Sequence, residues 1–202
     1  MPKASALFNE MTKRVKKLKG KYMARQIRNE LLNPLTYTHD PLNMAAYRLL
    51  VHAELEEYIE TKALEVLKKI RSDVQLSGFG TKYLQNLLAI SKQVETPLAI
   101  NLPYNEADFK NVVESIIKNA EGKISKNNGI RKDSFIKMAL FSGYEPAAID
   151  NVLLNSVDSY GKRRGAVAHK GPRHITNFSS PSAEVNDAES IISMLRLHYY
   201  GF

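Results

Sequence analysis

Residues 47–60 read YRLLVHAELEEYIE, and this stretch decides the fold class. Apolar side chains recur along it at steps of three or four, the period of an α-helix that packs one face against a core. The apolar line consists of Met44, Tyr47, Val51 and Tyr58. Asp40-Pro41 supplies a cap residue followed by proline at the first helical position. We therefore expect a long helix from about residue 41 to about residue 70.

The rest of the chain shows the same helical pattern between turn signals. A first helix should run from about residue 5 to residue 32 and end at Asn33-Pro34. Further helix starts are indicated at Thr81, Asn105, Asp133, Glu145-Pro146 and Ser180-Pro181, each of which precedes apolar residues at helical spacing. No segment is convincing as a strand. The pattern predicts an all-α bundle of about seven helices in a single domain over residues 1–202.

The net charge of +8 is concentrated at the N-terminus. Residues 1–28 hold nine Lys or Arg residues and one acid, so this segment alone carries the whole excess. Such a block favours an anionic partner, with RNA ahead of DNA or a membrane. The alternative is the solvated face of an amphipathic helix. We expect residues 1–32 to be a basic helix or arm added to a bundle of about residues 40–200, with RNA contacts from Lys13, Arg14, Lys16, Lys17, Lys19 and Lys21.

Several classes of chemistry are disfavoured by composition. The chain has no cysteine, and its five histidines form neither HExxH nor another dense ligand cluster, so we expect no metal and no cofactor. No apolar run approaches the ~18 residues of a membrane span, and the N-terminus lacks the features of a secretory signal. We expect a cytoplasmic protein with no membrane segment.

Two charged residues fall on apolar lines. Ile149, Leu153, Val157 and Tyr160 lead at helical spacing to Arg164, and Glu54 lies on the line of Tyr47 and Val51. An arginine cannot lose its charge, so an inward Arg164 needs a partner or an opening to solvent. Glu54 is its natural partner. Such a pair is either a structural ion pair that fixes helix register or part of a catalytic site.

Residues 161–171 read GKRRGAVAHKG, a basic and glycine-containing segment without an acid. His169 comes shortly before Gly171-Pro172, a strong helix stop, and follows Arg164 by about one and a half helical turns. Arg164 and His169 together resemble the Arg-x4-6-His signature of HEPN domains. Residues 47–60, followed by DSYGKRR at 158–164, are similar to the HEPN branch called RiboL-PSP. The resemblance covers roughly residues 40–200.

The resemblance implies a metal-independent endoribonuclease in which a ribose 2′-hydroxyl attacks the adjacent phosphate. Arg164 would bind the phosphorane oxygens, and the imidazole of His169 would transfer protons as general base or general acid. Glu54 would orient Arg164, while Arg163 and Lys170 would contact phosphates. HEPN domains usually form homodimers with face-to-face sites, so two His169 rings would share one composite site. A toxin or anti-phage role with a cognate antitoxin or regulatory protein is a refinement of this hypothesis.

Two alternatives stay open. Many active HEPN members have a polar residue, often asparagine, directly after the motif arginine, where this chain has Gly165. This departure favours a non-catalytic HEPN module that binds RNA or protein. The basic N-terminus would also suit a DNA-binding regulatory protein, but no helix-turn-helix pattern supports that hypothesis.

Overall fold

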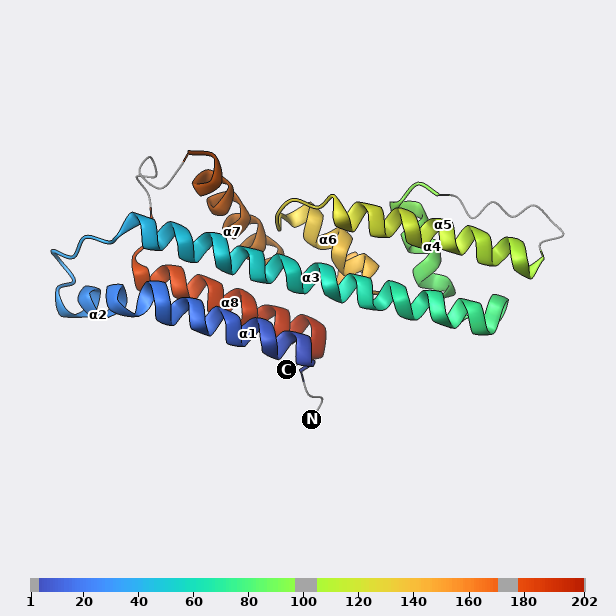
Figure 1. Cartoon of the computed structure of the whole chain (residues 1–202), viewed down its shortest axis with the longest axis horizontal. Coiled ribbons are helices and arrows are strands. Elements are labelled where there is room, and N and C mark those ends of the chain that lie inside the picture. The colour runs from blue at the N-terminus through green and yellow to red at the C-terminus, as the bar shows by residue number, and fades with distance from the viewer. Residues whose placement is uncertain (1–3, 97–104, 171–177, 202) are drawn as a thin grey trace. The chain divides into compact units, whose positions relative to one another are not determined.

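The computed structural model describes residues 4–96, 105–170 and 178–201, and within these ranges it contains helices and no strand, as predicted (Figure 1). The chain divides into two compact units. Unit 1 comprises Met1–Tyr58, Gly129–Lys132 and Asp150–Phe202, and unit 2 comprises Ile59–Asn128 and Asp133–Ile149. Gly171 and Pro172, the expected helix stop, lie outside the described residues.

Unit 1 is built from α1 (Ala6–Leu18), a π-helical turn (Lys19–Met23), α2 (Ala24–Leu32), the first part of α3 (Pro41–Ser77), α7 (Asn151–Lys170) and α8 (Pro181–Tyr200). Unit 2 contains the rest of α3, 3-10 turns at Gly78–Gly80 and Pro146–Ala148, α4 (Leu84–Gln93), α5 (Glu106–Ser125) and α6 (Lys132–Phe141). Since α1, the π-helical turn and α2 form one uninterrupted run, the described residues contain the seven helical segments that the sequence led us to expect.

Capping side chains fix several helix starts where they were predicted. The side chain of Asn105 accepts a hydrogen bond from the N–H of Asp108 at 2.8 Å, and Ser180 accepts one from Ala183 at 3.3 Å. The helix expected at Thr81 begins three residues later, at Leu84. The Thr81 hydroxyl accepts from Tyr83 N–H and donates to Asp73, so Thr81 belongs to the preceding turn.

The N-terminal helix packs into unit 1. Phe8, Met11 and Val15 of α1 are buried, and the hydroxyls of Ser5 and Tyr200 lie 2.6 Å apart. Figure 1 shows α1, α8 and the first part of α3 side by side. The expectation of one domain over residues 1–202 stays a prediction.

A buried ion pair, which the sequence did not reveal, joins α3 to α8. Arg48 donates to the two carboxylate oxygens of Glu184 at 2.8 and 2.6 Å, and the two side chains are 1% and 0% exposed. Two parallel, charge-assisted bonds of this kind have a specific geometry. They therefore fix the register of α8 against α3 within unit 1.

Candidate functional site around Arg164

Three successive cations on α7 lie in different electrostatic environments. Lys162 pairs with Asp158 at 2.7 Å, and Arg163 pairs with Asp187 of α8 at 2.6 Å. Arg164 is half-buried, and within the described ranges no carboxylate lies at ion-pair distance from it. Among the residues that the structure describes, Arg164 is thus the one cation of the three whose charge no neighbouring acid offsets.

The predicted partner of Arg164 binds a different arginine. Glu54 accepts a hydrogen bond from Nε of Arg14 at 2.5 Å, and Nη2 of Arg14 lies 3.5 Å from Glu57. The prediction of a Glu54–Arg164 pair is therefore wrong. Helical periodicity showed that both residues lie on packed faces, but it did not show that the Glu54 side of α3 packs against α1.

A turn at Gly129 lies directly beside the Arg164 guanidinium. Gly129 has a φ of +94°, which other residues rarely adopt. A Cβ atom there would lie 3.8 Å from Nη1 of Arg164 and 3.4 Å from Cε1 of His52. The turn therefore brings bare backbone between an arginine of α7 and a histidine of α3.

His52 is buried beneath this turn and acts as a hydrogen-bond acceptor. Its Nε2 accepts from the N–H of Ile130 at 3.1 Å, and its ring stacks on Tyr160 at a centroid distance of 6.4 Å. Burial, together with the positive charge of Arg164, lowers the pKa of His52 to about 4. His52 is therefore neutral at physiological pH, with its Nε2 lone pair directed at the turn.

The residues 129–132, which we call the turn segment, are also held from the α7 side. Gly161 of α7 lies so close to the carbonyl oxygen of Ile130 that a Cβ atom at position 161 would overlap it. Arg131 then pairs with Asp158 at 2.7 Å. Because Asp158 accepts from both Lys162 and Arg131, the pKa of its carboxyl is held well below the usual range.

His169 lies elsewhere on the same helix. It is exposed near the end of α7, as is Lys170. Five helical residues separate two side chains by roughly 140° around the axis and about 7.5 Å along it. Arg164 and His169 of one chain therefore leave α7 on different sides. Gly165 lies one turn before His169 on its side, and a Cβ atom there would meet nothing within 4 Å.

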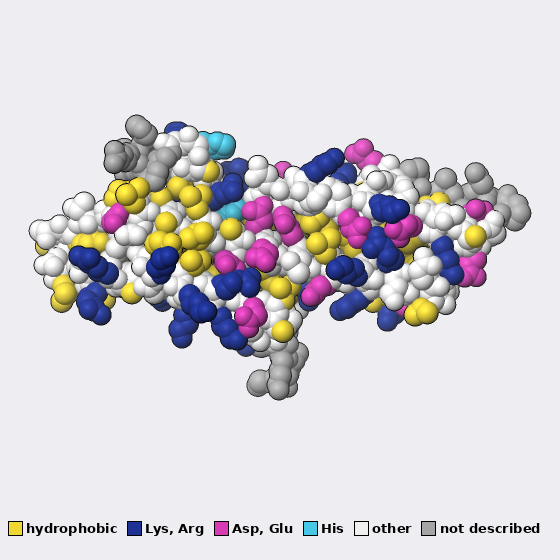
Figure 2. All heavy atoms as spheres, viewed as in Figure 1, with side chains coloured by type: hydrophobic (Ala, Val, Ile, Leu, Met, Phe, Trp, Pro, Cys, Tyr) yellow, Lys and Arg dark blue, Asp and Glu magenta, His cyan; other side chains and the backbone are white. Residues whose placement is uncertain are grey.

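The N-terminal cations divide into two groups. Lys13 pairs with Glu10, Arg14 with Glu54 and Lys19 with Glu189. Lys16, Lys17 and Lys21 are exposed and, in the part of the chain that the structure describes, have no carboxylate partner. Figure 2 shows Lys and Arg side chains gathered along the edge formed by α1 and α2.

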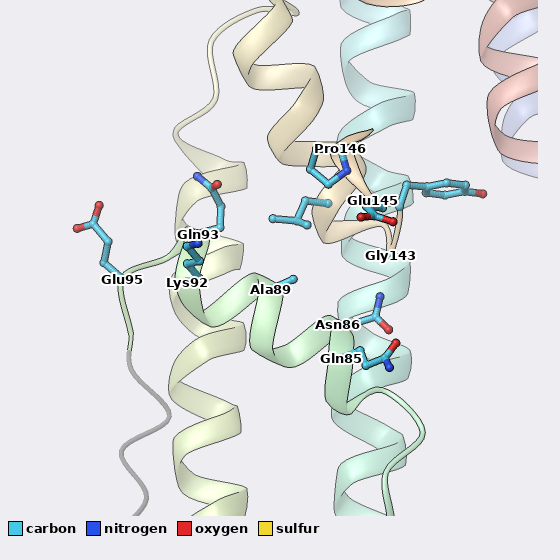
Figure 3. Close-up of a pocket in the computed structure, with 11 residues that line it drawn as sticks. Gln85, Asn86, Ala89, Lys92, Gln93, Glu95, Gly143, Glu145 and Pro146 are labelled. Carbon is cyan, nitrogen blue, oxygen red and sulfur yellow. The ribbon is translucent and has the colours of Figure 1, made fainter. Parts of the chain in front are cut away.

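The described residues were also compared with the requirements of a metal site, a membrane span and a ligand groove. No group of three His, Cys, Asp or Glu residues that could hold a metal ion occurs in those residues, and none of their helices is long and apolar enough to cross a membrane. Unit 2 has an open groove of about 870 Å³ between α4 and the turn after α6 (Figure 3). Amides from Gln85, Asn86 and Gln93 face it, beside Lys92 and Glu145. None of the predicted site residues lines this groove.

The sequence of this chain matches the model of one known protein family. The sequence model of the family described as RiboL-PSP-HEPN matches residues 12–197. The chain belongs to the RiboL-PSP branch of the HEPN family. No curated protein matches the chain, and no solved structure matches it either. HEPN domains are helical, RNase-like or RNA-binding modules. The match begins inside α1, which agrees with the packing of that helix in this HEPN chain.

Proposed function

We propose that this HEPN chain is a metal-independent endoribonuclease. The observation that carries the proposal is the environment of Arg164, a half-buried guanidinium without a carboxylate partner in the described residues, directly after two cations that are paired. An arginine in such a position is stabilised when an external anion binds it. A backbone phosphate of RNA supplies that anion.

The two motif residues suit complementary parts of a transesterification. The ribose 2′-hydroxyl attacks the adjacent phosphorus, and the bond to the 5′ oxygen of the next nucleotide breaks. Arg164 binds the non-bridging oxygens, where negative charge accumulates. His169 takes the hydroxyl proton or delivers a proton to the leaving oxygen. The products are a 2′,3′-cyclic phosphate and a 5′-hydroxyl, and since only RNA has the nucleophile, DNA is not cleaved.

The separation of Arg164 from His169 favours a site shared by two chains. Because the two side chains diverge by roughly 140° around α7, one helix presents them poorly to a single phosphate. A homodimer with face-to-face α7 helices supplies the second His169 ring, so that one ring serves as base and the other as acid. Lys170, exposed beside His169, contacts flanking phosphates. Arg163 contributes less, since Asp187 offsets its charge.

The unpaired N-terminal lysines fit the same substrate. Lys16, Lys17 and Lys21 attract the RNA backbone without reading its sequence. An RNase that binds RNA without regard to its sequence would cleave the RNA of its own cell unless a partner inhibited it. A toxin or anti-phage role, with an antitoxin or regulatory partner, is therefore part of this proposal.

A second candidate function is an RNA- or protein-binding HEPN module without catalysis, and Gly165 is the observation that favours it. Many active members carry a polar residue at that position, whereas here the site is open and has no side chain. Such a module would bind RNA and leave it intact.

The test compares Arg164→Ala with Lys162→Ala, the neighbouring cation that Asp158 neutralises. Cleavage of a fluorescent RNA substrate is measured in EDTA, which removes free metal ions. We expect Arg164→Ala to lower kcat/KM by about 100-fold or more, as is typical when a group that stabilises a developing oxyanion is removed. Lys162→Ala should stay within a few-fold of wild type. Equal losses would refute a specific role for Arg164, and a wild-type chain that binds RNA without cleaving it would favour the binding module.

A further inference from the structure

Two side chains of α3 hold two successive backbone amides of the turn segment. His52 Nε2 accepts from the N–H of Ile130 at 3.1 Å, and Glu56, one helical turn later, accepts from the N–H of Gly129. The Nδ1 atom of His52 lies 3.6 Å from Glu56, so these side chains are neighbours in one cluster. Buried amides cost free energy unless they are paired, so each acceptor stabilises this conformation of the segment.

The other side of the turn segment rests against α7, immediately before Arg164. Position 161 allows the carbonyl of Ile130 to approach because it is glycine, and Asp158 binds Arg131 and the N–H of Lys132. Gly129 then lies beside Nη1 of Arg164. The turn segment therefore lies between the two α3 side chains that bind its amides and the guanidinium of Arg164 that it contacts.

The chemistry of His52 suits a residue that holds the turn segment, and not one that competes with a substrate phosphate for Arg164. A neutral ring accepts the hydrogen bond from Ile130 without adding a charge at position 52. A buried cation at position 52 would repel the guanidinium, whereas burial keeps the imidazole neutral. An aliphatic residue would fill the same volume but would leave the N–H of Ile130 unpaired.

We propose that His52 and Glu56 are positioning residues that hold the turn segment against Arg164 and so fix its guanidinium for a substrate phosphate. This inference rests on the proposed function and deepens it. Neither residue touches RNA: both act through the backbone of Gly129 and Ile130. Catalytic groups must be held in a narrow range of positions, so loosening this support lowers turnover more than it lowers RNA affinity.

The experiment compares His52→Leu, His52→Gln and Val51→Ala. Leucine removes the acceptor, whereas the side-chain oxygen of glutamine extends about as far from the backbone as Nε2 and restores it. Val51 is buried at the adjacent position of α3, so Val51→Ala removes buried apolar volume but leaves both acceptors of the turn segment, His52 and Glu56, in place. Three properties are measured: amide hydrogen exchange at residues 129 and 130, the NMR resonance of Arg164 Nε–H, and cleavage of RNA as separate kcat and KM values.

We expect His52→Leu to speed exchange of the Ile130 amide by about tenfold or more, to broaden the Arg164 resonance, and to lower kcat by about 10- to 100-fold with little change in KM. His52→Gln should recover most of each property, and Val51→Ala should change none of them selectively. The inference is overturned if His52→Leu behaves like Val51→Ala, or if glutamine fails to rescue.

The same experiment separates this inference from the proposed function. If no chain cleaves RNA, the proposed nuclease is wrong. The exchange rates and the Arg164 resonance then still decide whether His52 holds the turn segment and the guanidinium.

Discussion

At the scale of single residues, charge compensation distinguishes Arg164 from its neighbours. Asp158 and Asp187 neutralise Lys162 and Arg163, whereas Arg164 faces a neutral histidine and a backbone turn. An arginine cannot escape this situation by losing its proton, because a guanidinium stays protonated in proteins. The guanidinium of Arg164 therefore stays positively charged and can bind an external anion.

The lowered pKa of His52 makes stability depend on pH. In the unfolded chain His52 has the ordinary pKa of about 6.5, whereas in the folded chain the pKa is about 4. The unfolded state thus binds the proton more readily. The stabilisation is complete above about pH 6.5 and is lost as the pH falls toward 4, with a slope of up to about 1.4 kcal/mol per pH unit.

Urea denaturation between pH 7.5 and 4.5 measures this slope. His52→Gln, which cannot titrate, should lose stability less steeply than wild type over the same interval. Carboxylates contribute to both chains, so the difference between the two slopes is the quantity of interest. Identical slopes would show that His52 is not held neutral in the folded chain.

Arg164 and His169 were recognisable from the sequence, but the surroundings of Arg164 were not. A short motif and a helical line were sufficient to select both residues. His52, Glu56 and Gly129 are distant from them in sequence, and each type is common in surface helices and turns. The spacing of His52 and Glu56 at i and i+4 was visible, but nothing in the sequence showed that a turn 73 residues after Glu56 would pack on them.

At the scale of helices, local chemistry made most of the fold predictable. Proline and capping residues mark where α3, α5 and α8 begin, and these signals act within a few residues of the chain. The pairing of helix faces depends instead on contacts between distant segments. This is why Glu54 was matched with the wrong arginine and why the buried Arg48–Glu184 pair was missed.

The packing of α1 changes how its basic face should be tested. Deleting the N-terminal segment would remove the buried residues Phe8, Met11 and Val15, so loss of RNA binding could reflect unfolding. Substitution of Lys16, Lys17 and Lys21 by glutamine leaves the buried face intact. These three lysines have no carboxylate partner in the described residues, so they are available to phosphates.

We expect this triple substitution to weaken RNA binding and to reduce the slope of log K against log salt by about two, since each contact with single-stranded RNA contributes about 0.7. The matched control replaces Lys13 and Lys19, which pair with Glu10 and Glu189, and should have a smaller effect per lysine. Fluorescence anisotropy at several salt concentrations provides the measurement. An unchanged slope in the triple variant would show that these lysines are solvated and do not contact RNA.

At the scale of the whole molecule, the family match from residue 12 to residue 197 draws on both compact units. Composition and periodicity were sufficient for the all-α class, because they report on local structure and solvent exposure. The division into two units was not foreseen: α3 is one uninterrupted helix that contributes residues to both, and no change of composition marks a boundary.

The proposed composite site makes a prediction about mixtures of chains. If each site needs His169 from both protomers, an excess of His169→Ala chains should capture wild-type chains in inactive heterodimers. At a ninefold excess with random pairing, activity per wild-type chain should fall to roughly a tenth. Excess Lys92→Ala chains, altered in the groove of unit 2, should instead add activity. Undiminished activity per wild-type chain would assign a complete site to a single protomer.

The most direct test of the central claim is cleavage of total cellular RNA in EDTA by wild type and His169→Ala, with the chemistry of the new ends determined. The account predicts that wild type produces 2′,3′-cyclic phosphate and 5′-hydroxyl ends. It also predicts that His169→Ala produces none while retaining RNA affinity, because phosphate contacts come mainly from lysine and arginine. Cleavage by His169→Ala at the wild-type rate, or the absence of any metal-independent cleavage by wild type, would contradict it.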